Sequence, residues 1–121
     1  MKILIQTESN YVEEQSRPTE DNFVFSYTIT IINQTDETVQ LISRHWLIKD
    51  ANFKVEEVVG DGVVGEQPIL LPNQGFQYSS GAILETEMGT MEGFYHFKKQ
   101  NGERFQVAIP TFVLSVPRQL H

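Results

Sequence analysis

The chain has 121 residues, with 9 Lys or Arg and 16 Asp or Glu, so its formal net charge at neutral pH is −7. This length suits one domain with its own core, and the acidic balance argues against general binding to nucleic acid or to an anionic membrane. The absence of cysteine excludes disulfide frameworks, thiolate metal sites and cysteine nucleophiles. The apolar run near the start is too short for a signal peptide, and no segment approaches the roughly 20 apolar residues of a membrane span. We therefore expect a single domain over residues 1–121, located in the cytoplasm.

The first half of the chain alternates apolar and polar residues, which is the period of a half-buried strand. A first strand is expected within residues 2–8, and the clearest alternation follows in FVFSYTITI, residues 23–31. The next segment, TVQLISRHWLI, changes phase, because Val39 and Leu41 share one face whereas Trp46 and Ile48 share the other. One extra residue exchanges the faces of a strand, so a β-bulge is predicted near Ser43 to His45.

The second half continues with short strands separated by turns. Strands are predicted over residues 54–59 and 76–80, and a hairpin is centred on Asn101 and Gly102, a dipeptide that favours a type I′ turn. Pro110 is expected to end the second arm of that hairpin, because proline has no N–H for the ladder, with an edge strand resuming after it.

Seven or eight short strands with turns at this spacing, and no window with a helical period, predict an all-β fold. The expected architecture is an antiparallel β-sandwich, immunoglobulin-like or fibronectin type III-like, with a buried tryptophan on about the third strand. The side chains expected to form much of the core are Phe25, Tyr27, Ile29, Trp46, Tyr95, Phe97 and Val107.

Residues 60–65, GDGVVG, match the pattern G-x-G-x-x-G. In a dinucleotide site this pattern follows a strand and opens a helix whose N-terminus receives the pyrophosphate. A strand leads in here, but Pro68 and a second turn leave no room for the helix. No Lys or Arg lies in residues 55–97, whereas Asp61 and Glu66 lie inside or beside the loop. The sequence therefore favours a structural turn over a nucleotide cradle.

Other candidate chemistry is sparse. Glu56 and Glu57 are neighbours on a predicted strand, so their side chains point to opposite faces and cannot share a substrate. His45 and His96 lie on separate strands without the spacing of a strong metal site, and no G-x-S-x-G elbow surrounds Ser80. His45 is expected to be partly buried and bonded to a backbone carbonyl. No nucleophile–base pair is found, so we expect neither an enzyme nor a cofactor.

Carboxylates concentrate in a region that lacks positive charge, and hard cations such as Mg²⁺ prefer oxygen ligands. If loops bring several carboxylates together, they would form a weak divalent-cation site, and Co²⁺ would also recruit an imidazole. The candidate ligands are Asp61, Glu66, Glu85, Glu87, Glu92 and His96. A solvated acidic surface is the alternative and the commoner outcome for surface carboxylates.

Three segments in order carry a family resemblance: SRHW at 43–46, GDGVVGEQPIL at 60–70 and SSGAILETEMGTMEGFYHF at 79–97. Together with YTITIINQ and IPTFVLS, they closely resemble the bacterial ApaG family over nearly the whole chain. The resemblance implies an immunoglobulin-like or fibronectin type III sandwich, no settled activity and no catalytic residue. It also implies a link to cobalt resistance and magnesium efflux, the origin of the alternative name CorD. Similar domains in eukaryotic F-box proteins and in a partner of DNA polymerase delta look like interaction modules.

The leading hypothesis is a non-enzymatic binding module for a protein partner, since a sandwich offers edge strands and loops for contact. The contact zone is expected in two glycine-rich segments taken to lie between strands, residues 60–65 and 79–93. Its candidate residues are Gly60, Asp61, Gly62, Gly65, Ser80, Gly81, Gly89 and Gly93. Glycines that serve turns alone are an equal alternative. A role in divalent-cation homeostasis is the second hypothesis, and nucleotide polyphosphate binding or hydrolysis is the third. Edge pairing would also permit a homodimer.

Overall fold

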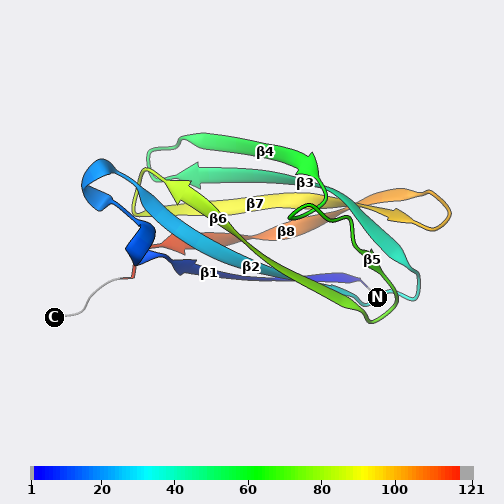
Figure 1. Ribbon diagram of the computed structural model, residues 1–121. Coiled ribbons are helices and arrows are strands. Elements are labelled where there is room, and N and C mark those ends of the chain that lie inside the picture. Colours follow the sequence, from blue (N-terminus) through cyan, green and yellow to red (C-terminus); the bar gives the residue numbers. More distant parts are fainter. Residues whose placement is uncertain (1, 118–121) are drawn as a thin grey trace.

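The structure, a computed structural model, describes residues 2–117, which form two antiparallel sheets packed face to face (Figure 1). One sheet has the order β1-β2-β6, made of β1 (Ile3–Tyr11), β2 (Phe23–Asn33) and β6 (Gly75–Leu84). The other has the order β4-β3-β7-β8, made of β3 (Val39–Asp50), β4 (Val55–Asp61), β7 (Met88–Lys99) and β8 (Arg104–Ser115). The short β5 (Ile69–Leu70) pairs with the start of β3, and the 3₁₀ helices η1 (Glu13–Gln15) and η2 (Pro18–Glu20) join β1 to β2. The predicted all-β antiparallel sandwich is confirmed.

The core lies between the sheets and follows the alternation of the sequence. Along β2 every odd position from Phe23 to Asn33 is buried, while the even positions are partly exposed. Six of the seven side chains predicted for the core are buried, and only Val107 is partly buried at its margin. Trp46 packs edge-to-face against Tyr27, Tyr95 and Phe112, with ring centroids 5.5, 6.2 and 5.9 Å away.

Two bulges adjust the register of the larger sheet. The pairing of β3 with β7 shifts between Leu41 and Ser43, slightly before the predicted position. The pairing of β7 with β8 shifts between Met91 and Gly93, where Pro110 and its neighbour oppose a single residue. The prediction that Pro110 ends the ladder is therefore wrong. Proline is tolerated there because it lies in a bulge of an edge strand, and β8 continues past it.

The hairpin between β7 and β8 also differs from the predicted type I′ turn. The amide of Lys99 donates to Glu103 O at 2.8 Å, and the amide of Gly102 donates to Lys99 O at 3.0 Å. Within the loop Gly102 has a positive φ, of +90°, and Asn101 does not. The loop is therefore a three-residue turn that ends in a left-handed glycine.

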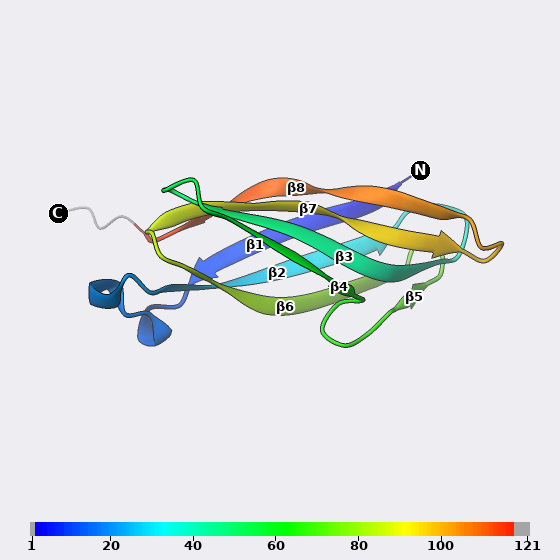
Figure 2. The same ribbon diagram turned by 90° about the horizontal axis from the view of Figure 1, so that it is seen from above.

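The two long sides of the sandwich differ, as the view from above shows (Figure 2). On one side β1 approaches β8, and Ser9 Oγ donates to Val113 O at 2.9 Å. On the other side β4 and β6 are each the last strand of their own sheet. We call this second side the open side, because a groove separates its two strands.

Candidate functional site

Residues 62–67 form the glycine loop, which leaves the sheet between β4 and β5. Gly62 and Gly65 have φ values of +61° and +81°, in the left-handed region that glycine adopts without strain. Val63 and Glu66 exchange two backbone hydrogen bonds of 2.8 and 2.9 Å, so the loop closes on itself. It continues into β5 and not into a helix, so it lacks the helix N-terminus that a pyrophosphate requires.

The loop covers the bulge of β3. Ile42 O accepts hydrogen bonds from the amide of Gly62 at 2.8 Å and from Gln67 Nε2 at 2.9 Å. A Cβ atom on Gly62 would lie 2.1 Å from Glu66 O, so this position has room for glycine only. The glycines thus allow the loop to donate hydrogen bonds to the carbonyl of Ile42, at the bulge where the pairing of β3 with β7 shifts.

Arg44 supplies a positive charge to this region that the sequence prediction missed. Its Nη1 donates to Asp61 O at 3.0 Å and to Gly62 O at 2.9 Å. The guanidinium also covers Gly60, where a Cβ atom would lie 2.9 Å from Nη2. The prediction considered only cations that flank the loop in sequence, whereas the register of β3 and β4 places Arg44 beside Gly60. The sequence does contain a signal for this position of Arg44. Residues two apart on a strand share a face, so Arg44 is expected on the same face as Trp46.

The groove of the open side lies between the two sheets and has a volume of about 560 Å³, within the range of small ligand sites. The wall from the larger sheet consists of Arg44, Trp46, Ile48, Glu56 and Val58. The opposite wall comes mainly from β2 and β6, with Gln15 of η1 at its margin, and consists of Val24, Tyr27, Ser80, Gly81, Ala82 and Ile83. Apolar side chains therefore occupy the middle of the larger sheet's wall, between Arg44 and Glu56.

In the part of the chain that the structure describes, two polar groups of this wall each lack one kind of partner: Arg44 lacks a carboxylate, and the indole N–H of Trp46 lacks a hydrogen-bond acceptor. Among residues 2–117 Arg44 takes part in no ion pair, although its side chain is partly buried. Trp46 is only 2% exposed, and its Nε1 has no hydrogen-bond partner within the described part of the chain. A guanidinium that donates to two carbonyls but has no carboxylate partner within the described residues leaves its charge uncompensated, so this end of the groove is suited to an anionic group.

The residues predicted as one contact zone are only partly brought together. Gly60 and Asp61 end β4 beside Arg44, and Ser80 and Gly81 line the groove from β6. Gly62 and Gly65 belong to the glycine loop.

Gly89 and Gly93 lie elsewhere, because both are inside β7. A Cβ atom there would lie 2.3 Å from Lys49 O and 1.9 Å from His45 O, respectively. The assumption that residues 79–93 lie between strands is thus wrong, because most of this segment belongs to β6 and β7. These two glycines permit close approach to β3.

The candidate cation ligands do not converge. Glu85 forms an ion pair with Lys54 at 2.6 Å, and Glu92 forms one with Lys49 at 3.0 Å. His96 packs edge-on against Phe94, with centroids 5.3 Å apart. Within residues 2–117 no group of three or more His, Asp or Glu side chains is placed to hold a metal ion.

Glu56 and Glu57 point to opposite faces of β4, as expected for neighbours on a strand, and Glu57 lies on the same face of the sheet as His45. Glu56 faces the groove, whereas Glu57 Oε2 lies on the outer surface, 2.9 Å from His45 Nε2. The partner of His45 is therefore a carboxylate and not the expected backbone carbonyl. The imidazole also packs against Phe94, with centroids 4.7 Å apart.

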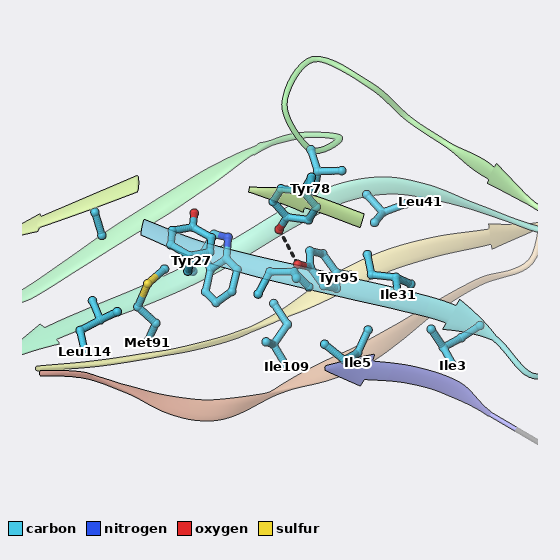
Figure 3. Packing of buried hydrophobic residues seen from close by; sticks show 14 of the residues in the cluster. Ile3, Ile5, Tyr27, Ile31, Leu41, Tyr78, Met91, Tyr95, Ile109 and Leu114 are labelled. Carbon is cyan, nitrogen blue, oxygen red and sulfur yellow. Dashed lines mark hydrogen bonds between the residues drawn. The ribbon is translucent and has the colours of Figure 1, made fainter. Parts of the chain in front are cut away.

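Tyr78 and Tyr95 form a hydroxyl pair buried between the two sheets (Figure 3). Burial raises the pKa of both phenols above the ordinary value, and the positive charge of Arg44 opposes this only in part. Both hydroxyls stay neutral at physiological pH, so this pair holds the sheets together and supplies no nucleophile.

No helix within residues 2–117 has the length and apolar character needed to cross a bilayer.

Residues 13–99 match the ApaG domain family. The chain is 52% identical to Protein ApaG of Pectobacterium carotovorum subsp. carotovorum over 120 residues, which cover 99% of this chain and 96% of that relative. Identity to Protein ApaG of Azoarcus sp. is 48%, with coverage of 99% and 94%. A crystal structure described as an ApaA protein from Bordetella pertussis superimposes with a TM-score of 0.94 at 45% identity, covering 98% of this chain and 96% of that one. The chain therefore belongs to the ApaG family.

Proposed function

We propose that this protein is a non-enzymatic binding module of the cytoplasm, which recognises a protein partner through the open side of its sandwich. The observation that carries the proposal is the groove between two strands that are each unpaired on one edge. Unpaired edges present backbone N–H and C=O groups to which another chain can add as a strand.

Exposed apolar side chains are more numerous on the edge strands of the open side than on those of the opposite side. Val55 and Val59 on β4 are 53% and 66% exposed, and Ile83 on β6 is 59% exposed, whereas β1 and β8 contribute Val113, at 53%. On the opposite side Ser9 links β1 to β8, and β8 carries the bulge at Pro110. Bulges and prolines are devices that discourage pairing at a sheet edge.

The polar groups of the groove support binding more than catalysis. Within the described residues no histidine lines the groove, and His45 is bonded to Glu57 on the outer face. A serine nucleophile needs an adjacent base within hydrogen-bond reach. Ser80 therefore lacks the neighbour that would activate it.

Site-specific photo-crosslinking in the native cell tests this function. A crosslinking residue at Ile83 probes the open side, and the matched control at Val113 probes a strand position of similar exposure, 53%, on the other side. We expect a discrete crosslinked protein from position 83 and none from position 113. Equal labelling at the two positions, or none at either, would contradict the proposal.

A further inference from the structure

We infer that the partner segment binds as an added strand beside β6 and antiparallel to it. Its side chains at alternate positions would be basic, apolar and acidic, and would point into the groove. This inference rests on the proposed function and specifies the chemistry of the partner.

The edge of β6 is the better of the two open-side edges for strand addition. Its ten residues, GFQYSSGAIL, contain no charge and no proline, and its pairing with β2 has no register shift. The seven residues of β4 include the acidic Glu56, Glu57 and Asp61. An edge without charge, proline or bulge lacks the usual protection against an incoming strand.

The groove also gives access to the backbone of β6. Ser80 and Ala82 line it from the inner face of the strand, whereas Gly81 and Ile83 line it from the outer face. A cavity that touches both faces of an edge strand surrounds the backbone edge between them. An added strand placed there would extend the smaller sheet and turn one face of its side chains towards β3 and β4.

The wall that such a strand would meet carries one charge at each end. Arg44 pairs in register with Gly60, and Ile48 pairs with Glu56, four residues further along. The two charges are thus separated by roughly 13 Å along the strand, at about 3.3 Å per residue. Neither side chain takes part in an ion pair within residues 2–117. Between the two charged ends lie the buried Trp46 and the partly exposed Val58, which pair in register.

An extended segment matches this wall with side chains at positions i, i+2 and i+4, which share one face of a strand. A basic residue would meet Glu56, an apolar residue would meet Val58 beside Trp46, and an acidic residue would meet Arg44. The pattern is basic–x–apolar–x–acidic.

The order of the charges along an antiparallel added strand follows from the ends of β6. Leu84 lies at the Glu56 end, since both residues line one smaller cavity together with Asp50. Tyr78 lies at the other end, because its hydroxyl is bonded to that of Tyr95, which pairs in register with Arg44. A strand antiparallel to β6 runs from the level of Leu84 towards Tyr78, so its basic residue comes first. A second copy of this chain cannot supply the pattern from β6, which has no charged residue.

A pair of blocked peptides of identical composition tests the inference. The first is Thr-Lys-Thr-Val-Thr-Glu-Thr, and the second exchanges its Lys and Glu. Titration followed by amide chemical shifts should place the first peptide at residues 79–83 of β6. Two charge contacts of modest strength predict roughly tenfold tighter binding for the first peptide than for the second. Equal binding of the two peptides, no binding of either at millimolar concentration, or shifts centred on β8 would overturn the inference.

Glu56→Lys and its neighbour Glu57→Lys form a matched pair of variants. Only residue 56 faces the groove, so Glu56→Lys should weaken the first peptide roughly three- to tenfold, while Glu57→Lys leaves its affinity unchanged. Replacing the peptide's Lys with Glu should restore affinity to the Glu56→Lys variant. Arg44 is not replaced, because it also holds the backbone of Asp61 and Gly62. If both variants behave alike, strand addition in this register is wrong. Crosslinking at position 83 would still support the binding module, so the two proposals fail separately.

Discussion

The hydroxyls of Tyr78 and Tyr95 lie 2.5 Å apart and join an edge strand of one sheet to a central strand of the other (Figure 3). Each is enclosed by the core, at 7% and 0% exposure. The pair connects the edge strand β6, which borders the groove, with the centre of the larger sheet.

Stability should fall at high pH because of these two phenols. Burial raises the pKa of both in the folded protein, whereas in the unfolded chain each titrates near 10. Above about pH 10 the unfolded chain therefore releases protons that the folded chain retains. The free energy of unfolding then decreases by up to about 1.4 kcal/mol per pH unit for each phenol. Below that pH both states keep the phenol protons, so the phenols contribute no pH dependence. Denaturant titrations between pH 8 and 11 measure this slope.

Removing both hydroxyls should be milder than removing one. Tyr78→Phe alone leaves the Tyr95 hydroxyl buried without its partner, at a cost of about 1–3 kcal/mol. The double variant Tyr78→Phe/Tyr95→Phe removes both polar groups and keeps the shape, so its stability at pH 7 should approach that of the wild type. It should also lose the alkaline slope. Additive losses from the two single variants would show that the hydroxyls are not coupled.

Gly62→Ala and Gly65→Ala separate backbone strain from steric exclusion. Both glycines have positive φ, so each substitution costs about 1–2 kcal/mol. At Gly65 nothing lies within 4 Å of an added Cβ, whereas at Gly62 the Cβ would lie 2.1 Å from Glu66 O. Gly62→Ala should therefore lose a further 1–3 kcal/mol or so through overpacking. Equal unfolding midpoints for the two variants would mean that the loop relaxes around the new methyl group.

Trp46→Ala should cost about 3–5 kcal/mol, because the indole is buried among three aromatic rings. Phe53→Ala is the control, since Phe53 is 91% exposed and its substitution should change the unfolding free energy by less than about 0.5 kcal/mol. Urea denaturation of both variants gives the comparison. An unchanged midpoint for Trp46→Ala would contradict its place in the core.

The glycine loop should not bind nucleotides. Equilibrium binding of ATP, NAD and diadenosine tetraphosphate, with and without Mg²⁺, is the direct measurement. We expect no specific binding, because the loop leads into β5 and not into a helix, so it lacks the helix N-terminus that receives a pyrophosphate. Specific micromolar binding that disappears in a folded Gly65→Ala variant would reverse this conclusion.

The strands were predictable because apolar and polar residues alternate along a half-buried strand, with a period of two residues. This is why residues such as Phe25 and Trp46 were placed correctly. The details that depend on pairing were not available in that pattern. Pro110 is compatible with β8 only because a bulge receives it, and the hairpin turn depends on where Lys99 and Glu103 meet.

The candidate site was predicted less well for a related reason. Sequence proximity placed the glycine loop in an environment without cations, whereas strand register brings Arg44 to it from β3. The groove arises from two strands, β4 and β6, that are not hydrogen-bonded to each other. A local sequence pattern carries no information about such a pair of edges.

β4 and β5 are in effect two halves of one edge strand, since both pair with the same edge of β3 and the glycine loop interrupts them. Each half is anchored by its own hydrogen bonds, so the length of the loop does not set the register of either one. Because loop closure cost rises only slowly with length, a few residues inserted near Val64 would be tolerated energetically. We therefore expect this interruption to accept a short insertion between Val64 and Gly65, at the expense of the two hydrogen bonds between Val63 and Glu66 but with both halves of the edge strand kept.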